Sequence, residues 1–296
     1  MGTPPWRMAM QSSVWPSECT LMIDLHTHST ASDGALTPDA LVRKASEEGL
    51  SAIALTDHDS LDGLPEAAAA ACRLGMRFVP GIEIEIAFEP GEFHLLGLDF
   101  EDAGDALREA AKSLARSRED RNRAVVELLR ADGVDIDYEA LREQAGTGML
   151  GRPHIAQFLV EKRVVKNKQA AFDRYLAKGR PYYLRKACLE LGEAVRIVHE
   201  SGGLAFVAHP MSLFASWTRF RSLFVEWKEL GVDGLEAWHP TARMADCRRL
   251  EALAHQAGFR VSAGSDYHGA VRPDRRLGHT AGDRPISDEY LSCLSR

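Results

Sequence analysis

The sequence lacks the features of membrane, secreted and duplex-DNA-binding proteins. No apolar run approaches the roughly 18–20 residues of a membrane span, and residues 1–20 have no apolar central stretch like that of a secretory signal. The net charge is -7, so no overall basic field favours tight binding to duplex DNA. We expect no membrane or duplex-DNA partner, and we expect residues 1–20, which contain several prolines and serines, to be a disordered leader.

Cysteine is scarce and scattered. No Cys-x-x-C pair is present, so neither a disulfide framework nor a thiolate zinc site is indicated; the five cysteines are Cys19, Cys72, Cys188, Cys247 and Cys293. This usage fits a reducing compartment, and we expect a cytoplasmic location.

The rest of the chain has enough apolar residues, 45% of 296, to bury a large core. Short apolar runs alternate with helical patterns, as in strand–helix units around a parallel sheet. The expected strands are Leu21–Leu25, Ser51–Leu55, Phe78–Ile86, Phe93–Leu98, Leu204–Ala208, Gly234–Trp238 and Arg260–Ala263. The expected helices are Pro38–Glu48, Leu64–Leu74, Leu191–Glu200, Phe220–Leu230 and Ala242–Ala257. This spacing predicts an α/β fold of the β/α-barrel type.

Residues 101–186 interrupt this alternation with almost wholly helical patterns. They contain 18 Lys and Arg residues against 14 Asp and Glu residues, a net charge of +4. We predict an inserted helical cap at 101–186 and a barrel built from 21–100 and 187–296. A basic cap can grip an anionic substrate, although a solvated helical face would show the same charge pattern.

Histidines follow the first two predicted strands. His26 and His28 are two residues apart, so they point to the same side and can share one metal ion. Asp33 lies in Ser-Asp-Gly, where an aspartate can also simply form a turn. His58 ends the second strand, at the barrel edge that carries catalytic residues. Its neighbours in Thr-Asp-His-Asp, Asp57 and Asp59, either support the imidazole or cap the next helix.

Carboxylates inside an apolar strand need a partner. Glu83 lies in Pro-Gly-Ile-Glu-Ile-Glu, where burying an unpaired carboxylate would be costly, and a bridging position between two cations removes that cost. Glu85 has the same parity and competes for this role. His94, near the start of the next run, is a candidate for a third metal site or an ordinary strand histidine.

The same pattern returns after the insertion, with His209 at the end of one strand and Asp266 and His268 at the end of another. Candidate ligands therefore recur at the ends of successive strands, which predicts a cage for two or three divalent cations. The ligands are nitrogen and oxygen, which suits manganese, zinc or iron; we favour manganese. No protein nucleophile with an adjacent base is evident, so we expect attack by water activated between metal ions.

Arginines interrupt the apolar stripe of the first predicted cap helix. The stripe is Leu107, Ala111, Leu114, Arg118, Arg121, Val125 and Leu128. Buried guanidinium groups need anionic partners. Arg118 and Arg121 therefore either form salt bridges or, together with Arg152 and His154, bind a substrate phosphate. His239 and His279 are interpreted as supporting or structural residues, and we assign no role to His199 and His255.

Four blocks of the sequence together resemble the polymerase-and-histidinol-phosphatase (PHP) superfamily of metal-dependent phosphoesterases. They are Asp-Leu-His-Thr-His-Ser, Leu-Thr-Asp-His-Asp, Pro-Gly-Ile-Glu with the later His94, and Ala-His-Pro with Gly-Ser-Asp-Tyr-His. The resemblance implies a distorted, seven-unit β/α barrel with a trinuclear metal centre. The first implied site is His26, His28, Glu83 and Asp266; the second is Asp33, His58 and His268; the third is His94 and His209 with Glu83 as a bridge.

Within this superfamily the chain is most similar to one branch. Asp33 stands where some relatives carry histidine, and Gly-Arg-Pro-His-Ile-Ala lies inside the insertion at Gly151–Ala156. Both features resemble the branch that acts on nucleoside 3',5'-bisphosphates and on RNA 5' ends. The resemblance implies hydrolysis of the 3' phosphate of a nucleoside 3',5'-bisphosphate. The alternatives are 5' to 3' exonuclease activity on short RNA or hydrolysis of another small phosphorylated metabolite. Glu-Ala-Trp-His-Pro, at Glu236–Pro240, departs from the pattern of the known relatives.

Overall fold

The computed structural model describes residues 21–88, 93–146, 150–185 and 187–295. The predicted leader, residues 1–20, lies outside these ranges. None of the described helices combines the length and hydropathy that crossing a membrane requires. The four cysteines in the described ranges, Cys72, Cys188, Cys247 and Cys293, are free thiols.

A seven-stranded sheet forms the body of the protein, and its strands lie in the sheet in chain order. They are β1 (Met22–Asp24), β2 (Leu50–Leu55), β3 (Arg77–Ile86), β4 (Phe93–Leu98), β5 (Leu204–Ala208), β6 (Gly234–Trp238) and β7 (Arg260–Ala263). Just beyond the ends of β1 and β7, Thr27 and Tyr267 form a parallel bridge, so the first and last strands approach each other there. The predicted α/β fold with a parallel-rich sheet is confirmed.

One strand differs from the expected parallel arrangement. β4 runs antiparallel to both β3 and β5, whereas the other neighbouring strands are parallel. The physical reason is the short connection between Ile86 and Phe93, because a parallel crossover needs about a dozen residues or more. The reversal brings His94, near the start of β4, to the edge where β3 ends.

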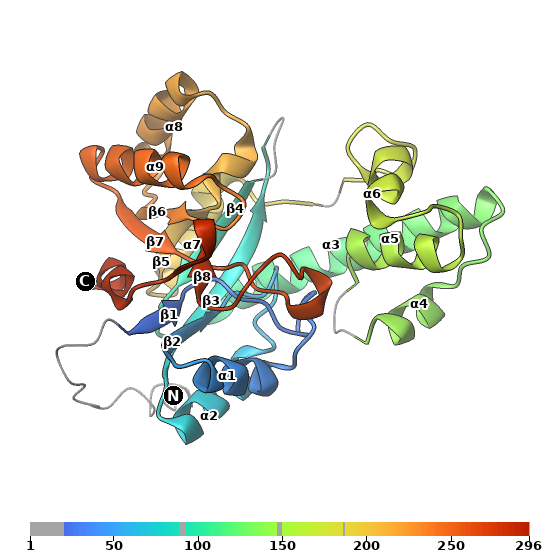
Figure 1. The fold of residues 1–296 in the computed structure, drawn as a ribbon. Helices are drawn as coiled ribbons and strands as arrows, with labels where there is room; N and C mark the ends of the chain where they lie inside the picture. The colour runs from blue at the N-terminus through green and yellow to red at the C-terminus, as the bar shows by residue number, and fades with distance from the viewer. Residues whose placement is uncertain (1–20, 89–92, 147–149, 186, 296) are drawn as a thin grey trace.

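Helices alternate with the strands on the outside of the sheet (Figure 1). They are α1 (Pro38–Glu47), α2 (Leu64–Leu74), α7 (Leu191–Glu200), α8 (Trp217–Glu229) and α9 (Met244–Gln256). α1 begins where the Thr37 side chain accepts a hydrogen bond from the Ala40 N–H, and α2 ends at Gly75 in a left-handed conformation. A short hairpin of β8 (His279–Thr280) and β9 (Arg284–Pro285) follows β7, with short 3₁₀ segments around it.

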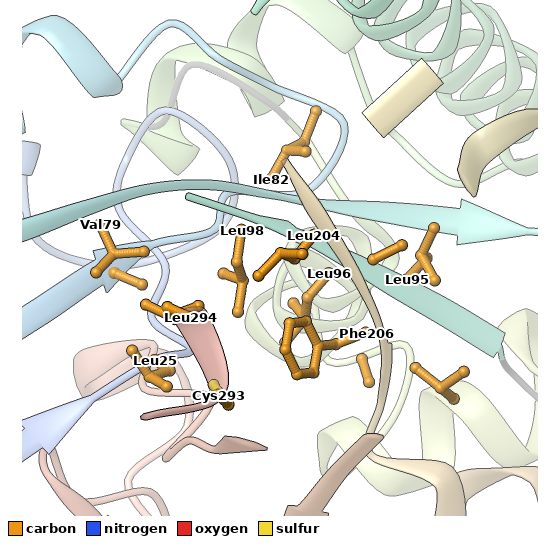
Figure 2. Packing of buried hydrophobic residues seen from close by; sticks show 14 of the residues in the cluster. Leu25, Val79, Ile82, Leu95, Leu96, Leu98, Leu204, Phe206, Cys293 and Leu294 are labelled. Carbon is orange, nitrogen blue, oxygen red and sulfur yellow. The ribbon is translucent and has the colours of Figure 1, made fainter. Parts of the chain in front are cut away.

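The core of the body is built from side chains of the sheet and of these helices. Figure 2 shows Leu96, Leu98, Leu204 and Phe206 gathered from β4 and β5. The register pairs Leu96 with Phe206 and Leu98 with Leu204, so these side chains share one face. On the same face Glu83 lies opposite Leu96. This face of the sheet therefore changes from apolar to charged toward the ends of the strands that carry the candidate ligands.

The described residues between 101 and 185 form helices and loops without a strand. The elements are α3 (Gly104–Ala131), α4 (Tyr138–Ala145), α5 (Arg152–Glu161), α6 (Lys168–Ala171) and a π-helical turn (Phe172–Leu176). Figure 1 shows them to one side of the sheet, with α3 running from the body into this group. Leu107, Ala111 and Leu114 of α3 join the body core, whereas its second half joins a separate apolar cluster with α4 and α5.

The buried face of α3 differs from the predicted stripe at one position. Leu128 is partly exposed, and Val126 and Leu129 are buried instead. The predicted stripe assumes that one continuous face of α3 is buried along the whole helix. The second half of the helix packs against α4 and α5 rather than against the sheet, so its buried face rotates.

Candidate metal centre

His26 and His28, directly after β1, are the start of a first group of candidate ligands. Their Nε2 atoms are 3.1 Å apart. Glu83 Oε2 lies 3.3 Å and Asp266 Oδ1 lies 3.1 Å from His28 Nε2. All four side chains are buried, and one ligand atom from each lies within 4.8 Å of the others. Two imidazoles and two carboxylates in this arrangement can hold a divalent cation.

Asp33, His58 and His268 form a second group together with His28. His268 Nε2 is 3.2 Å and His58 Nε2 is 3.9 Å from Asp33 Oδ1. The His268 Nδ1–H donates to the backbone oxygen of Asp266 at 2.8 Å. This bond fixes the tautomer, so the lone pair of His268 Nε2 faces Asp33.

A third group surrounds Glu83. Its Oε1 is 2.8 Å from His94 Nδ1 and 2.9 Å from His209 Nε2. Its Oε2 is 2.9 Å from His58 Nδ1 and also faces the first group. One carboxylate thus presents its two oxygens to different sets of imidazoles, as a ligand bridging two cations must.

The residues present fit a group of divalent cations. Several buried atoms of these side chains form no hydrogen bond of good geometry, although some of them lie within about 3 Å of one another: His28 Nδ1, His58 Nδ1, Glu83 Oε2 and His268 Nε2. Leaving a buried polar atom unpaired costs about 1–3 kcal/mol, and coordination would remove that cost. The ligand atoms are nitrogen and oxygen, with no thiolate among them.

The electrostatics of the ligand groups favour bound cations, because ionised carboxylates face the imidazoles. Burial opposes charge on Glu83, but the imidazoles of His58, His94 and His26 outweigh it and hold the pKa of this carboxyl well below its usual range. Burial also opposes charge on His28, but the nearby carboxylates of Asp266 and Glu83 raise its pKa to about 9. In the metal-free protein His28 therefore holds a proton, and metal binding must displace it.

Two buried aspartates anchor the loops that carry the ligands. Asp24 accepts hydrogen bonds from the N–H groups of Ser265 at 3.0 Å and Gly278 at 2.8 Å, tying the end of β1 to the segment after β7. Asp57 accepts from the N–H and the hydroxyl of Ser29, at 2.8 and 2.7 Å, and so fixes the loop after His28. Asp57 therefore supports the loop, and α2 begins after Gly63 without a side-chain cap.

Two features of the backbone allow the groups to come so close. A Cβ atom at Gly264 would lie 2.3 Å from the Cβ of His26 and 2.6 Å from Glu236 Oε1, so only glycine fits. His209 and Asp266 have positive φ values of 30° and 51°. Such strained conformations concentrate at functional sites, where the surrounding structure enforces them.

Glu236 is a buried residue whose role the sequence did not reveal. Its Oε1 is 2.9 Å from His26 Nδ1 and its Oε2 accepts the N–H of His209 at 2.8 Å. A carboxylate on one imidazole nitrogen orients the other nitrogen toward a metal ion. Glu236 opens the segment Glu-Ala-Trp-His-Pro, in which this sequence differs from the known relatives. Its position as a glutamate inside the buried strand Gly234–Trp238 could have indicated a supporting role from the sequence.

The carboxylate of Asp266 is held from both sides. Oδ1 faces the first group, and Oδ2 accepts a hydrogen bond from Arg275 Nη1 at 2.7 Å and lies 3.3 Å from His239 Nε2. Arg275 and His239 are both buried, and their side-chain nitrogens are 3.0 Å apart. This arrangement supports the interpretation of His239 as a supporting residue. No local sequence pattern pointed to Arg275.

Replacing Arg275 with methionine should weaken divalent-cation binding by about 10–100-fold, because the second oxygen of Asp266 loses the partner that fixes its orientation. Titration calorimetry of the metal-free protein with Mn²⁺ measures this. Arg276→Met is the matched control, since the Arg276 side chain is exposed and pairs with Asp283. Equal affinities in the two variants would contradict this role.

Three arginines of α3 and α5 gather near the ligand groups. Arg118 Nη2 donates to Asp59 Oδ2 at 2.6 Å, which ties α3 to the loop after β2. Arg121 is equally buried, at 8% exposure, and burial followed by repulsion from Arg152 and Arg118 lowers its pKa to about 10. The Nε atoms of Arg118 and Arg121 have no hydrogen-bond partner. The burial of Arg121 and its repulsion by two neighbouring guanidinium groups favour an anion beside it.

His154 lies beside this cluster, in the first turn of α5. Its Nδ1 accepts the N–H of Gly151 at 3.0 Å. Burial lowers its pKa, while the charge of Asp33 acts in the opposite direction. His154 is therefore near the second ligand group, as a residue that contacts substrate would be.

The other candidates take different places. Glu85 lies outside the three ligand groups, and its Oε1 is 3.7 Å from Cys188 Sγ. His279 is buried and bonded to the backbone oxygen of Leu277, as a structural residue would be. His199 pairs with Asp233 at the surface.

Comparison with known proteins gives one family and several full-length relatives. The PHP domain family model matches residues 24–196. A 3',5'-nucleoside bisphosphate phosphatase of Chromobacterium violaceum is 34% identical over 89% of this chain and 93% of its own length. A 5'-3' exoribonuclease of Haemophilus influenzae is 33% identical over 84% of this chain and 90% of its own length.

Two solved structures share the whole fold. An amidohydrolase from Chromobacterium violaceum with bound sulfate has a TM-score of 0.80 and 32% identity, covering 93% of this chain and 97% of that one. A protein from Bifidobacterium adolescentis described as a metal-dependent phosphoesterase has a TM-score of 0.79 and 27% identity, covering 93% of this chain and 95% of that one. The overall arrangement of strands and helices is therefore common to these proteins.

Proposed function

Because the chain belongs to the PHP domain family and is a metal-dependent phosphoesterase, we propose that it releases the 3' phosphate of nucleoside 3',5'-bisphosphates. The observation that carries this substrate is the pairing of two anion-binding features. A buried group of metal ligands takes the reacting phosphate, and the arginines of the cap, above all Arg121, whose Nε has no hydrogen-bond partner, take the other one. The relative named as a 3',5'-nucleoside bisphosphate phosphatase supports this choice.

We propose that nine side chains hold the cations: His26, His28, Asp33, His58, Glu83, His94, His209, Asp266 and His268. The absence of thiolate ligands suits manganese, which we favour, as well as zinc or iron. Divalent cations there would polarise the phosphoryl group and lower the pKa of a water molecule. Glu236 keeps His26 oriented toward the cation site, and Arg275 keeps Asp266 oriented toward it.

The cap side chains would bind and orient the second phosphate. Arg118 is already charge-paired with Asp59, whereas Arg121 is repelled by Arg118 and Arg152, so Arg121 would gain most from a bound phosphate. Arg152 opens α5, and its guanidinium carbon lies 5.5 Å from the centre of the Tyr183 ring. If the arginines bind the 5' phosphate, the 3' phosphate lies at the metal ligands and is the one that is hydrolysed.

The proposal is tested by phosphate release from adenosine 3',5'-bisphosphate with Mn²⁺ present. Adenosine 5'-monophosphate and 3'-monophosphate are the comparison substrates. The expected result is fast release of the 3' phosphate from the bisphosphate and much slower release from either monophosphate. Equal rates on all three would contradict the assignment of a second phosphate site.

Replacing Arg152 with alanine should raise KM for the bisphosphate by about 10-fold or more, because a charge-assisted hydrogen bond is worth about 1.5–3 kcal/mol. The KM for a minimal aryl phosphate should change little, since that substrate has no second phosphate. Steady-state kinetics on both substrates measures the difference, with the exposed Arg174→Ala as control. Equal effects on both substrates would argue against contact between Arg152 and the substrate.

A second candidate is 5' to 3' exonuclease activity on short RNA, favoured by the relatives named as 5'-3' exoribonucleases. The same ligand groups would serve this reaction, and the basic cap would follow the strand. A labelled oligoribonucleotide assayed beside the bisphosphate separates the two. Higher kcat/KM for the oligonucleotide would make the exonuclease the main activity.

We further propose that residues 101–186 form a cap domain on a barrel of 21–100 and 187–296. The separate apolar cluster of α4, α5 and the second half of α3 supports this division. A cytoplasmic location rests on the cysteine usage and stays a prediction.

A further inference from the structure

A cavity of about 430 Å³ lies between the cap helices and two loops of the body. On the body side it is lined by Thr30, Gly34 and Ala35 and by Ala270 and Val271. On the cap side it is lined by residues of α4, α5 and α6. The cavity therefore sits between the two parts whose side chains make up the proposed site.

The body wall of this cavity belongs to the loops that carry two candidate ligands. Gly34 directly follows Asp33, and Ala270 is two residues beyond His268. The two loops are joined, because the N–H of Ala35 donates to the backbone oxygen of His268 at 3.0 Å. A molecule with its phosphate at the second ligand group can thus extend along these loops into the cavity.

His154 connects the cavity with the phosphate-binding side chains. It lines the cavity, and the charge of Asp33 acts on its imidazole. Arg152, two residues earlier, acts electrostatically on Arg121. The arginine cluster, the second ligand group and the cavity consequently adjoin one another around the start of α5.

The lining of the cavity suits an uncharged, flat molecule better than a phosphate. Leu141, Phe158 and Val271 supply apolar surface. Gln144 and Gln157 supply amide groups, and both donate to the carboxylate of Glu161, which holds them in place. Among the described lining residues no arginine is present, and the one lysine, Lys168, is accompanied by the carboxylate of Glu161. Apolar walls with a few oriented polar groups are typical of small-molecule sites, which span about 300–1,000 Å³.

We propose that this cavity receives the nucleobase of the nucleotide. This inference rests on the proposed function: with one phosphate at the metal ligands and the other at the arginines, the base is the part of the substrate that remains. Its faces pack against Phe158 and Val271, and its edge meets the amides of Gln144 and Gln157. The base therefore contributes to binding together with both phosphates.

The test compares two substrates that differ only in the base. One is adenosine 3',5'-bisphosphate, and the other is the same ribose 3,5-bisphosphate with hydrogen in place of the base. The wild-type protein should prefer the nucleotide by about 10-fold or more in kcat/KM, the range expected for filling an apolar pocket. Ala270→Trp places an indole in the cavity from an exposed position and should bring the ratio of the two kcat/KM values close to one.

Controls separate this effect from loss of folding. Gln169→Trp, at an exposed position of α6 outside the lining, should keep the wild-type ratio. Val271→Trp is a second cavity variant, to be used if Ala270→Trp fails to give the wild-type circular dichroism spectrum. For Val271→Trp, too, the ratio of the two kcat/KM values should be close to one.

Each outcome has a distinct meaning. A ratio that stays at the wild-type value in both cavity variants overturns the base site. A selective loss of activity on oligoribonucleotides, with the bisphosphate ratio kept, also overturns it, because the cavity would then take the next nucleotide of a strand. If the wild-type protein hydrolyses neither bisphosphate, the proposed function fails and the base site fails with it.

Discussion

Replacing Glu83 with glutamine is expected to lower kcat/KM for phosphate release by at least about 10³-fold, since metal ions supply several kcal/mol of transition-state stabilisation. Glu83 offers one oxygen to His94 and His209 and the other to His58 and the first ligand group. The amide keeps the size of the side chain but has only one oxygen, so it cannot bridge two cations. Elemental analysis of the same preparation should show fewer bound cations than in the wild type.

The matched control for this variant is Glu109→Gln, at an exposed position of α3. It should keep the activity and the metal content of the wild type. The measurement pairs steady-state kinetics with metal content because a structural role for Glu83 would lower stability without a fixed relation to bound metal. Wild-type metal content in a folded, inactive Glu83→Gln protein would contradict the bridging role.

Replacing Asp33 with alanine should remove one cation per chain and lower kcat/KM by about 10²-fold or more. Its Oδ1 is the only carboxylate oxygen that faces both His268 Nε2 and His58 Nε2 in the second group. The first group does not contain Asp33, so its cation should stay. The expected order of metal content is therefore wild type, then Asp33→Ala, then Glu83→Gln.

Asp105→Ala, at an exposed position in the first turn of α3, is the control for Asp33. Mass spectrometry of the metal content and kinetics on the bisphosphate are measured together. Full metal content in the Asp33→Ala protein would contradict a role for Asp33 as a metal ligand, and its role would then be that of a turn residue.

The grouping of the candidate ligands could be predicted because its signal is local. Most of these side chains stand near the point where an apolar run starts or stops, and parallel strands bring such ends to one edge. Glu83 lies inside its run and is singled out by the cost of burying an unpaired carboxylate. The structure brings all nine together, including His94. His94 reaches the same edge because β4 runs antiparallel. That reversal follows from the short connection after Ile86, which the strand assignments already contained.

The residues that support the ligands could not be predicted in the same way. Glu236 and His26 are 210 positions apart, and the hydrogen bond between them depends on how β6 and β1 meet in the fold. Arg275 lies in a loop of charged residues, where nothing distinguishes it from the exposed Arg276. Partners that meet only through tertiary packing leave no periodic pattern in the sequence.

Some helix boundaries could also not be predicted from the apolar pattern alone. Leu64–Leu74 and Leu191–Glu200 begin and end as predicted, because apolar periodicity and a terminal glycine or proline mark them. α8 begins at Trp217, three residues before the predicted start at Phe220. Ser216 caps it by accepting the N–H of Arg219, a signal that the apolar pattern alone missed.

The most direct measurement is the metal content of the protein purified without chelator, followed by its activity after removal and return of cations. About two or three equivalents of divalent cation per chain are expected, with phosphate release lost on chelation and restored by Mn²⁺. A folded preparation that contains no divalent cation, takes none up and still hydrolyses the bisphosphate would contradict the assignment of these imidazoles and carboxylates as metal ligands.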